Sequence, residues 1–178
     1  MSTLSEVHRD LLERWRPIMN LVGPGPVEEQ FEDCRRGIKG LEPTGRWADL
    51  GSGAGFPGLV LAALHPTLRV DLVDSRRKRC TFLERVVLDA GRGDQVRVLC
   101  ERVEDVPAAT YDGITARAFA PPPEVLVHAE RLLKPGGVAL LFLQLDQAIV
   151  PGWDVVRETR YRLPDGRDRR TLLVRKAE

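Results

Sequence analysis

The sequence predicts an α/β protein whose central sheet is mostly parallel and ends in an antiparallel hairpin. From residue 46 onward, short apolar runs alternate with segments whose apolar residues recur at helical spacing, which is the pattern of strand–helix–strand units. The run 138–143 (VALLFL) is wholly apolar and has the length of a strand buried on both faces. With 178 residues, 43% of them hydrophobic, the chain can build a single core without disulfides or metals.

These patterns predict seven strands, three helices between them and a turn near the end of the chain. The strands are expected at 46–50, 69–73, 95–99, 113–116, 138–143, 153–163 and 169–175. The helices are expected at 57–64, at 78–90 before Gly91, and from Pro121–Pro123 to Lys134. The turn Pro164-Asp165-Gly166 separates the last two strands, which therefore form the hairpin.

Two further helices precede the sheet. Leu4, Val7, Leu11, Leu12 and Trp15 share one helical face, and an acidic helix is expected over 27–38. These segments are too small to fold alone. We expect residues 1–45 to form a helical N-terminal cap that is not independent, and residues 46–178 to form the main domain.

Charge and cysteine content exclude several classes of protein. The 27 basic and 26 acidic residues leave a net charge of +1, so nucleic acid would have to be bound by a local basic patch. The first twelve residues lack the apolar run of a secretory signal, and we expect a cytoplasmic monomer without membrane contact. Cys34, Cys80 and Cys100 show no paired spacing, so neither a metal site nor a disulfide is expected.

The segment 49–58 (DLGSGAGFPG) follows the first strand, where ligands bind in doubly wound sheets. Phe56 occupies the sixth position from Gly51, so the dinucleotide pattern G-x-G-x-x-G is absent, and so is the Gly-Lys-Ser/Thr of a phosphate loop. The pattern G-x-G-x-G after Asp49 resembles motif I of S-adenosylmethionine-dependent methyltransferases. That cofactor has no phosphates, and its ammonium group suits a nearby carboxylate. Asp74 ends the second strand, 23 residues after Gly51, and suits ribose hydroxyls.

Five segments carry a more specific resemblance: 49–59, 72–86, 101–105, 114–121 and 132–137. Their order and spacing resemble those of the GidB (glucose-inhibited division protein B) or RsmG family, with a shortened and divergent N-terminal part. The resemblance implies a Rossmann-like class I methyltransferase fold and methylation of guanine N(7) in 16S rRNA, with S-adenosylmethionine as cofactor. It also implies 16S rRNA or the 30S subunit as partner.

Carried over residue by residue, the resemblance places Asp74 at the ribose, Val103 and Glu104 beside the adenine, and Arg117 as the catalytic residue. The full set of expected cofactor contacts is Asp49, Gly51, Ser52, Gly53, Gly55, Phe56, Asp74, Ser75, Arg102, Val103, Glu104 and Arg117. Guanine N(7) carries a lone pair and no proton, so no catalytic base is expected. His8, His65 and His128 are interpreted as structural or surface residues.

Two basic clusters could hold RNA phosphates. They are Arg76, Arg77, Lys78 and Arg79, and, in the hairpin, Arg157, Arg160, Arg162, Arg167, Arg169 and Arg170. Three departures from the family pattern lie on the substrate side. Residues 32–36 (EDCRR) replace an expected His, and residues 143–146 (LQLD) replace Lys-Gly. The acids Glu28, Glu29, Glu32 and Asp33 would repel a phosphate backbone if they face the crevice.

These departures leave two alternatives open. One is methyl transfer to a small molecule or another acceptor. The other is a non-catalytic protein that binds the cofactor or RNA. Transfer to an amino group is disfavoured, because Ala120-Pro121-Pro122-Pro123 lacks the amide or carboxylate and the aromatic ring that amino methyltransferases place after the fourth strand.

Overall fold

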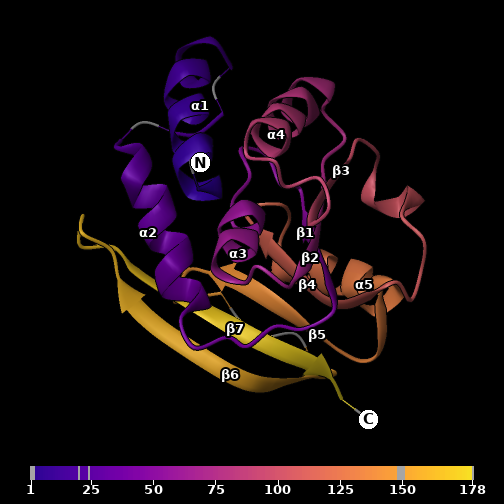
Figure 1. Ribbon diagram of the computed structural model, residues 1–178. Coiled ribbons are helices and arrows are strands. Elements are labelled where there is room, and N and C mark those ends of the chain that lie inside the picture. The colour runs from indigo at the N-terminus through magenta and orange to yellow at the C-terminus, as the bar shows by residue number, and fades with distance from the viewer. Residues whose placement is uncertain (1–2, 20, 24, 148–150, 178) are drawn as a thin grey trace.

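A seven-stranded sheet organises the computed structural model, which describes residues 3–19, 21–23, 25–147 and 151–177 (Figure 1). The strand order is β3-β2-β1-β4-β5-β7-β6. The first five strands in this order, β3, β2, β1, β4 and β5, run parallel to one another, and β7 is antiparallel to both β5 and β6. The strands are β1 (Arg46–Leu50), β2 (Arg69–Val73), β3 (Val96–Leu99), β4 (Tyr111–Arg117), β5 (Leu133–Leu143), β6 (Trp153–Arg162) and β7 (Asp168–Lys176). The predicted fold class, a mostly parallel sheet closed by an antiparallel hairpin, is confirmed.

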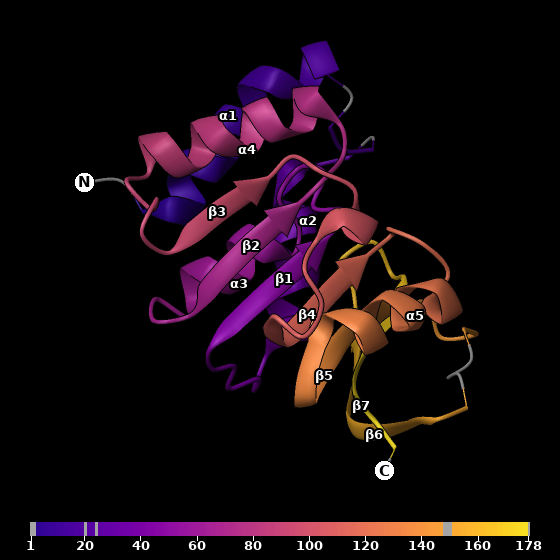
Figure 2. The same cartoon turned by 90° about the vertical axis from the view of Figure 1, so that its right-hand side faces the viewer.

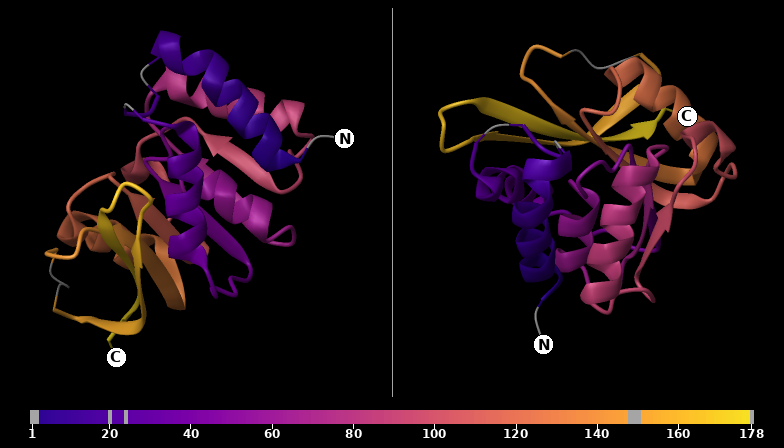
Figure 3. Two further views of the ribbon diagram at one scale, coloured as in Figure 1. Left: turned by 90° about the vertical axis from the view of Figure 1, so that its left-hand side faces the viewer. Right: turned by 90° about the horizontal axis from the view of Figure 1, so that it is seen from above.

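Helices cover both faces of this sheet (Figures 2 and 3). One face carries α1 (Leu4–Met19), α2 (Val27–Ile38), α3 (Gly58–Leu64) and α4 (Arg77–Asp89), whose apolar side chains form one core cluster with β1, β2 and β3. The opposite face carries α5 (Pro122–Leu132) and a 3₁₀ turn, Val103–Asp105, in a second cluster. The central parallel strands are buried on both faces, and they carry the buried polar residues Asp49, Asp71 and Thr115 among their apolar ones.

The predicted boundary between α5 and β5 is wrong, and β4 (Tyr111–Arg117) extends beyond its predicted range of 113–116. Strand β5 begins at Leu133, not at residue 138, and α5 ends at Leu132, not at Lys134. Leu133 pairs with Tyr111 before a register irregularity, after which Gly113 pairs with Val138. The intervening Lys-Pro-Gly-Gly therefore lies inside an irregular strand, although its composition is typical of a turn.

The two N-terminal helices pack on the sheet domain through regularly spaced apolar residues. Helix α2 buries Val27, Phe31, Cys34 and Ile38, which recur at helical spacing. At Gly37 an added Cβ would lie 2.4 Å from Cε1 of Phe142 and 2.7 Å from Cγ2 of Thr171, so α2 approaches β5 and β7 closely because residue 37 lacks a side chain. The Thr171 hydroxyl also donates a hydrogen bond to the Gly37 carbonyl at 2.9 Å.

No helix in the described part of the chain combines the length and the apolar character needed to cross a membrane. The three cysteines are free thiols, with Cys34 and Cys80 buried.

Candidate functional site

The glycine loop after β1 has a backbone that only glycine adopts easily. Gly51, Gly53 and Gly55 have φ angles of 66°, 56° and 94°. An added Cβ at Gly51 would lie 2.4 Å from Cδ2 of Phe119, whereas at Gly53 the nearest atom would be 3.7 Å away. The backbone at Gly53 is therefore open to an approaching ligand.

Three hydrogen bonds to two other parts of the chain hold this loop. The Ser52 N–H donates to the Val73 carbonyl at 3.0 Å, which ties the loop to the end of β2. The Gly53 N–H donates to Oδ2 of Asp74 at 2.9 Å. From α1, Nε2 of His8 donates to the Ala54 carbonyl at 2.6 Å. The loop is thus fixed in shape before any ligand binds.

Asp49 is fully buried behind the loop, with one oxygen bonded and the other without a partner. Oδ2 accepts a hydrogen bond from the Gly58 N–H at 3.1 Å, and Oδ1 has no partner among the residues described. Burial raises the pKa of Asp49 to about 7, although the Gly58 N–H opposes this rise. Asp49 is therefore a buried carboxyl group behind the loop, with one acceptor oxygen that the described residues leave unbonded.

Asp74 is also buried, and it supports the loop. Its Oδ1 accepts from the Arg76 N–H at 2.9 Å, while Oδ2 accepts from the Gly53 N–H and, at a longer 3.4 Å, from Nη1 of Arg79. The long Arg79 contact is the weakest of the three and is the one that a ligand hydroxyl could replace.

A cavity of about 440 Å³ opens beside the loop, at the carboxyl ends of β1, β4 and β5. Its walls come from the loop, the segment after β4, the end of β5, helix α2 and the C-terminal hairpin. Its lining residues include Gly51, Ser52, Gly53, Phe56, Arg79, Arg117, Phe119, Gln30, Asp33, Tyr161, Arg167 and Arg169. Ligands of doubly wound folds bind at such a strand-end crevice.

Arg117, the last residue of β4, is the main charged group inside this cavity. Its Nη1 donates to Oδ2 of Asp33 at 2.8 Å, and its Nη2 donates to Oε1 of Gln30 at 2.8 Å. The guanidinium lies over the Phe56 ring, 5.1 Å from the centroid. Arg117 therefore connects the glycine loop with helix α2.

The structure places the predicted site residues in three groups. Gly51, Ser52, Gly53, Phe56 and Arg117 line the cavity. Asp49, Gly55 and Asp74 support the loop from behind: an added Cβ at Gly55 would lie 2.4 Å from Leu59.

The third group lies outside the cavity walls. Ser75 is exposed, and Arg102 and Glu104 form an exposed ion pair at 3.6 Å. Val103 is 5% exposed and packs in the core cluster on the α5 face. Because none of the four lines the cavity, their adenine and ribose contacts stay a prediction.

Sequence reasoning missed several residues of the site. His8, Gln30, Phe119 and Tyr161 reach the loop or the cavity from distant parts of the chain. Their helical or strand patterns contained no signal for this, because only the folded chain brings residues 8, 30 and 161 to the loop.

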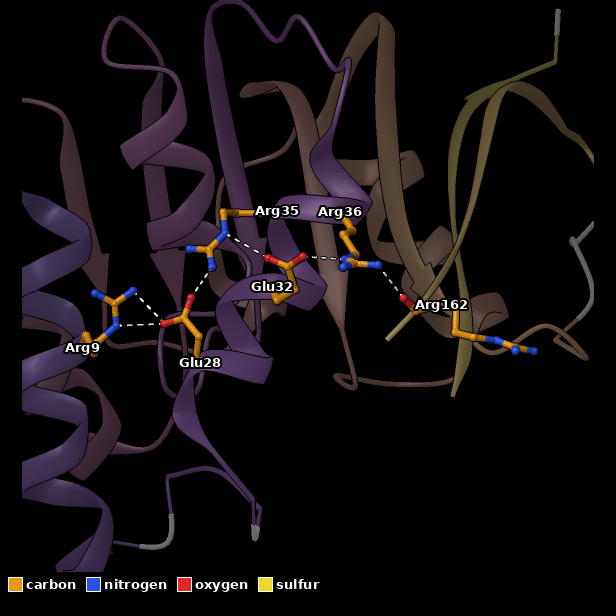
Figure 4. Close-up of polar contacts among 6 residues, drawn as sticks. All are labelled: Arg9, Glu28, Glu32, Arg35, Arg36 and Arg162. Carbon is orange, nitrogen blue, oxygen red and sulfur yellow. Dashed lines mark hydrogen bonds and ion pairs between the residues drawn. The ribbon is translucent and has the colours of Figure 1, made fainter. Parts of the chain in front are cut away.

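Arginines pair with the acids of α2, and the expected repulsion of phosphate by these acids stays a prediction. Glu28 pairs with Arg9 and Arg35, and Glu32 pairs with Arg35 and Arg36 (Figure 4). The hydrogen bond from Arg36 lowers the pKa of Glu32. Glu29 lies 3.8 Å from Arg167, and Asp33 pairs with Arg117.

Within the described ranges, no cluster of three potential metal ligands occurs. The cavity is a shaped crevice with a bare backbone loop, a buried carboxylate (Asp33) paired with a largely buried arginine (Arg117), and two further buried carboxylates, Asp49 and Asp74, behind the loop.

Comparison with known proteins gives one family. The family described as rRNA small subunit methyltransferase G (GidB) matches residues 5–147. A ribosomal RNA small subunit methyltransferase G from Paracoccus denitrificans is 32% identical over 136 residues, covering 74% of this chain and 70% of the relative. One of the same description from Novosphingobium aromaticivorans is 48% identical over 98 residues, covering 55% of this chain and 42% of the relative. The match thus spans between 42% and 70% of these relatives' length.

Solved structures share the fold. MtNAS in complex with MTA and tNA superposes with a TM-score of 0.68 at 14% identity, covering 98% of this chain and 70% of that one. A variant of MtNAS in complex with S-adenosylmethionine gives a TM-score of 0.67 at 14% identity, covering 98% and 72%. TrmN from Thermus thermophilus gives 0.56 at 21% identity, covering 88% and 55%.

Proposed function

The chain belongs to the GidB family, rRNA small subunit methyltransferase G, and from this premise we propose that it transfers a methyl group from S-adenosylmethionine to guanine N(7) of 16S ribosomal RNA. The observation that carries the proposal is the family match over residues 5–147, which includes the glycine loop and Arg117.

The residues of the cavity fit S-adenosylmethionine. The open backbone at Gly53 lets the ligand approach the loop closely, and the carboxyl group of Asp49, buried behind the loop, suits the ammonium group of the methionine part by its charge when ionised. Asp74 would hold the ribose by exchanging its long contact with Arg79 for a hydroxyl. When bound, the cofactor supplies a methyl group on a positively charged sulfur, which is an electrophile.

The remaining tasks of the chain are to orient the acceptor and to exclude water. Guanine N(7) presents a lone pair without a proton, so no side chain has to remove one. Phe56 and Phe119 give the cavity apolar walls, and Arg117 offers N–H donors beside them. We assign Arg117 the role of orienting the acceptor base by hydrogen bonding.

Of the two basic clusters, the one at the start of α4 supports RNA contact better. Arg76, Arg77 and Lys78 are exposed, and the first turn of α4 contains no acidic residue, so these cations oppose the helix dipole. Among the described residues of this cluster, only Arg79 forms an ion pair, with Asp74. In the hairpin, by contrast, Arg160, Arg162, Arg167 and Arg170 each pair with a nearby acid; their partners are Glu158, Asp168, Asp165 and Glu158.

Calorimetric titration with S-adenosylmethionine tests the cofactor, and transfer of a labelled methyl group tests the acceptor. We expect binding, followed by transfer to undermodified 30S subunits or naked 16S rRNA. Transfer only to molecules in a metabolite pool would assign a small-molecule acceptor, and binding without any transfer would assign a non-catalytic role. Absence of cofactor binding would contradict the proposal as a whole.

A further inference from the structure

Helix α2 contributes a buried carboxylate to the cavity. Asp33 is 9% exposed, although aspartate side chains usually face solvent. Burial of a carboxylate costs least when both oxygens are bonded and its charge is balanced. Both conditions hold here, because an arginine and a tyrosine bind the two oxygens.

The two partners of Asp33 lie on two different strands. Oδ2 accepts from Nη1 of Arg117 at 2.8 Å, and Oδ1 accepts from the hydroxyl of Tyr161 at 2.7 Å. Burial, together with the negative charge of Asp33, raises the pKa of Tyr161, so the hydroxyl keeps its proton and remains a donor. Arg117 and Tyr161 therefore both donate to Asp33, and these two hydrogen bonds form a series that links β6 through α2 to β4.

This series fixes the guanidinium of Arg117 inside the cavity. The arginine side chain has several rotatable bonds, so a guanidinium without partners would sample many positions. Here the Asp33 carboxylate and the Gln30 amide hold its two terminal nitrogens, and the Phe56 ring supports one face. The guanidinium plane is thereby set relative to the glycine loop, which carries Phe56.

We propose that Asp33 is the positioning residue for Arg117 in methyl transfer, and that Tyr161 orients Asp33 for this task. The proposal rests on the proposed function, because it assigns Arg117 to the acceptor side of the same cavity. It makes α2 and the C-terminal hairpin parts of the reaction site, and it gives a role to an acid that the sequence alone marks as unfavourable for RNA.

Steady-state kinetics with 30S subunits give the first test. Asp33→Asn keeps the shape of the side chain and removes the charge that holds Arg117. We expect kcat to fall by roughly 10- to 100-fold, since small displacements of a positioning group have effects of this size. The KM for S-adenosylmethionine should change by less than about twofold, because Asp33 lies on the acceptor side. Tyr161→Phe, which removes one hydrogen bond, should lower kcat about fivefold.

Non-additivity gives the second test. If Asp33 acts through Arg117, Asp33→Asn should add little to the loss of kcat already caused by Arg117→Ala. Glu28→Gln is the matched control: Glu28 lies on the same helix and also pairs with arginines (Figure 4), but it does not line the cavity. This control should keep the activity of the wild type.

A spectroscopic signature separates this proposal from the proposed function. In protein labelled with ¹⁵N-arginine, the guanidinium signals of Arg117 should be sharp and slow to exchange in the wild type and in Glu28→Gln. They should broaden or disappear in Asp33→Asn, whether or not the protein methylates an acceptor. If the wild type transfers no methyl group, the proposed function fails and the Arg117 signal alone decides whether Asp33 positions this side chain.

Two outcomes would overturn the proposal. One is an Arg117 signal that persists unchanged in Asp33→Asn. The other combines two results: kcat falls in proportion to thermal stability in both Asp33→Asn and Asp33→Ala, and the effect of Asp33→Asn on kcat adds to that of Arg117→Ala. Together these results would assign Asp33 a structural role only.

Discussion

The two carboxylate oxygens of Asp49 lie in different surroundings. One oxygen accepts a hydrogen bond from the Gly58 N–H at the start of α3, and the other lacks a partner in the described structure. A buried acceptor without a partner reduces stability. The raised pKa of Asp49 lessens this cost, because a protonated carboxyl group is neutral.

The raised pKa of Asp49 predicts a pH dependence of stability. Burial raises this pKa from 3.8 to about 7, so between these values the folded protein retains a proton that the unfolded chain releases. The contribution of Asp49 to the free energy of unfolding consequently falls as pH rises through this window, by about 1.4 kcal/mol per unit. Asp49→Asn should lack this fall, so its stability relative to the wild type should rise by about 2–3 kcal/mol between about pH 5 and pH 8.

Urea unfolding at a series of pH values measures this difference. His8 has the opposite effect: burial lowers its pKa from 6.5 to about 4, so stability is lost as pH falls between these values. The wild type and Asp49→Asn both keep His8, so its contribution cancels in the comparison. The exposed Asp94→Asn is the control, and an equal pH-dependent change in that variant would contradict the assignment to Asp49.

Gly53 offers a test of the loop that leaves the fold intact. The substitution Gly53→Asp should be tolerated, because the atom nearest to an added Cβ is 3.7 Å away and aspartate adopts the left-handed region more easily than most residues. The new carboxylate would enter the ligand's space beside Asp74. We expect S-adenosylmethionine affinity to fall by more than about tenfold, which is about 1.4 kcal/mol, and the unfolding free energy to change by about 1 kcal/mol.

Calorimetry and urea unfolding measure the two quantities. Gly91→Asp is the matched control, since Gly91 has a similar φ of 61° and open surroundings but lies after α4. Equal affinity in wild type and Gly53→Asp would remove the loop from the binding site.

At the residue scale, local motifs were predictable and contacts across the fold were not. Asp49, Asp74 and the glycines stand in one short pattern or at a strand end, so their neighbourhood follows from sequence. Asp33 and Tyr161 are 128 positions apart, and His8 and Ala54 are 46 apart. No local pattern carries such pairings, which is why Asp33 was interpreted as a charge that repels RNA.

Among the elements, α2 depends on its closest contact with the sheet. Gly37 lets α2 lie against Phe142 and Thr171, and the same helix carries Asp33. Gly37→Ala has two opposing effects on the free energy of unfolding. Alanine favours the helix by about 1 kcal/mol, but its Cβ would overlap two side chains, which costs about 1–3 kcal/mol. Because contacts of 2.4 and 2.7 Å demand real displacement, the overlap should dominate.

We expect Gly37→Ala to lower the unfolding free energy by about 1–2 kcal/mol and to speed amide hydrogen exchange in α2 more than in β1. Gly93→Ala, which meets no atom within 4 Å, controls for the loss of a glycine. A stabilised Gly37→Ala would show that α2 can shift away from the sheet without strain.

The elements themselves were largely predictable because their apolar patterns are strong. Helix α2 matches its predicted range of 27–38, and β1 and β2 match theirs. The start of β5 was not predictable, because Lys134, Pro135 and Gly136 are typical of a turn and only pairing of Leu133 with Tyr111 extends the strand.

For the whole molecule, a net charge of +1 means that RNA affinity must come from a local patch. If Arg76, Arg77 and Lys78 contact phosphates, changing all three to alanine should weaken binding to 16S rRNA and reduce the slope of log K against log salt by about 2. Affinity for S-adenosylmethionine should stay the same.

Filter binding at several salt concentrations gives this slope. The matched control replaces Arg160 and Arg162, which already pair with Glu158 and Asp168, by alanine. A larger loss of slope in the control would move the RNA contact to the hairpin.

The series that joins Tyr161, Asp33 and Arg117 also determines at what point of its synthesis the chain can complete the reaction site. The three residues come from widely separated parts of the chain. During synthesis, a growing chain therefore cannot form both hydrogen bonds before residue 161 has left the ribosome. A copy of the chain cut short before residue 161 lacks the hydrogen bond that orients Asp33, so its turnover of the acceptor should be slower than that of the full chain.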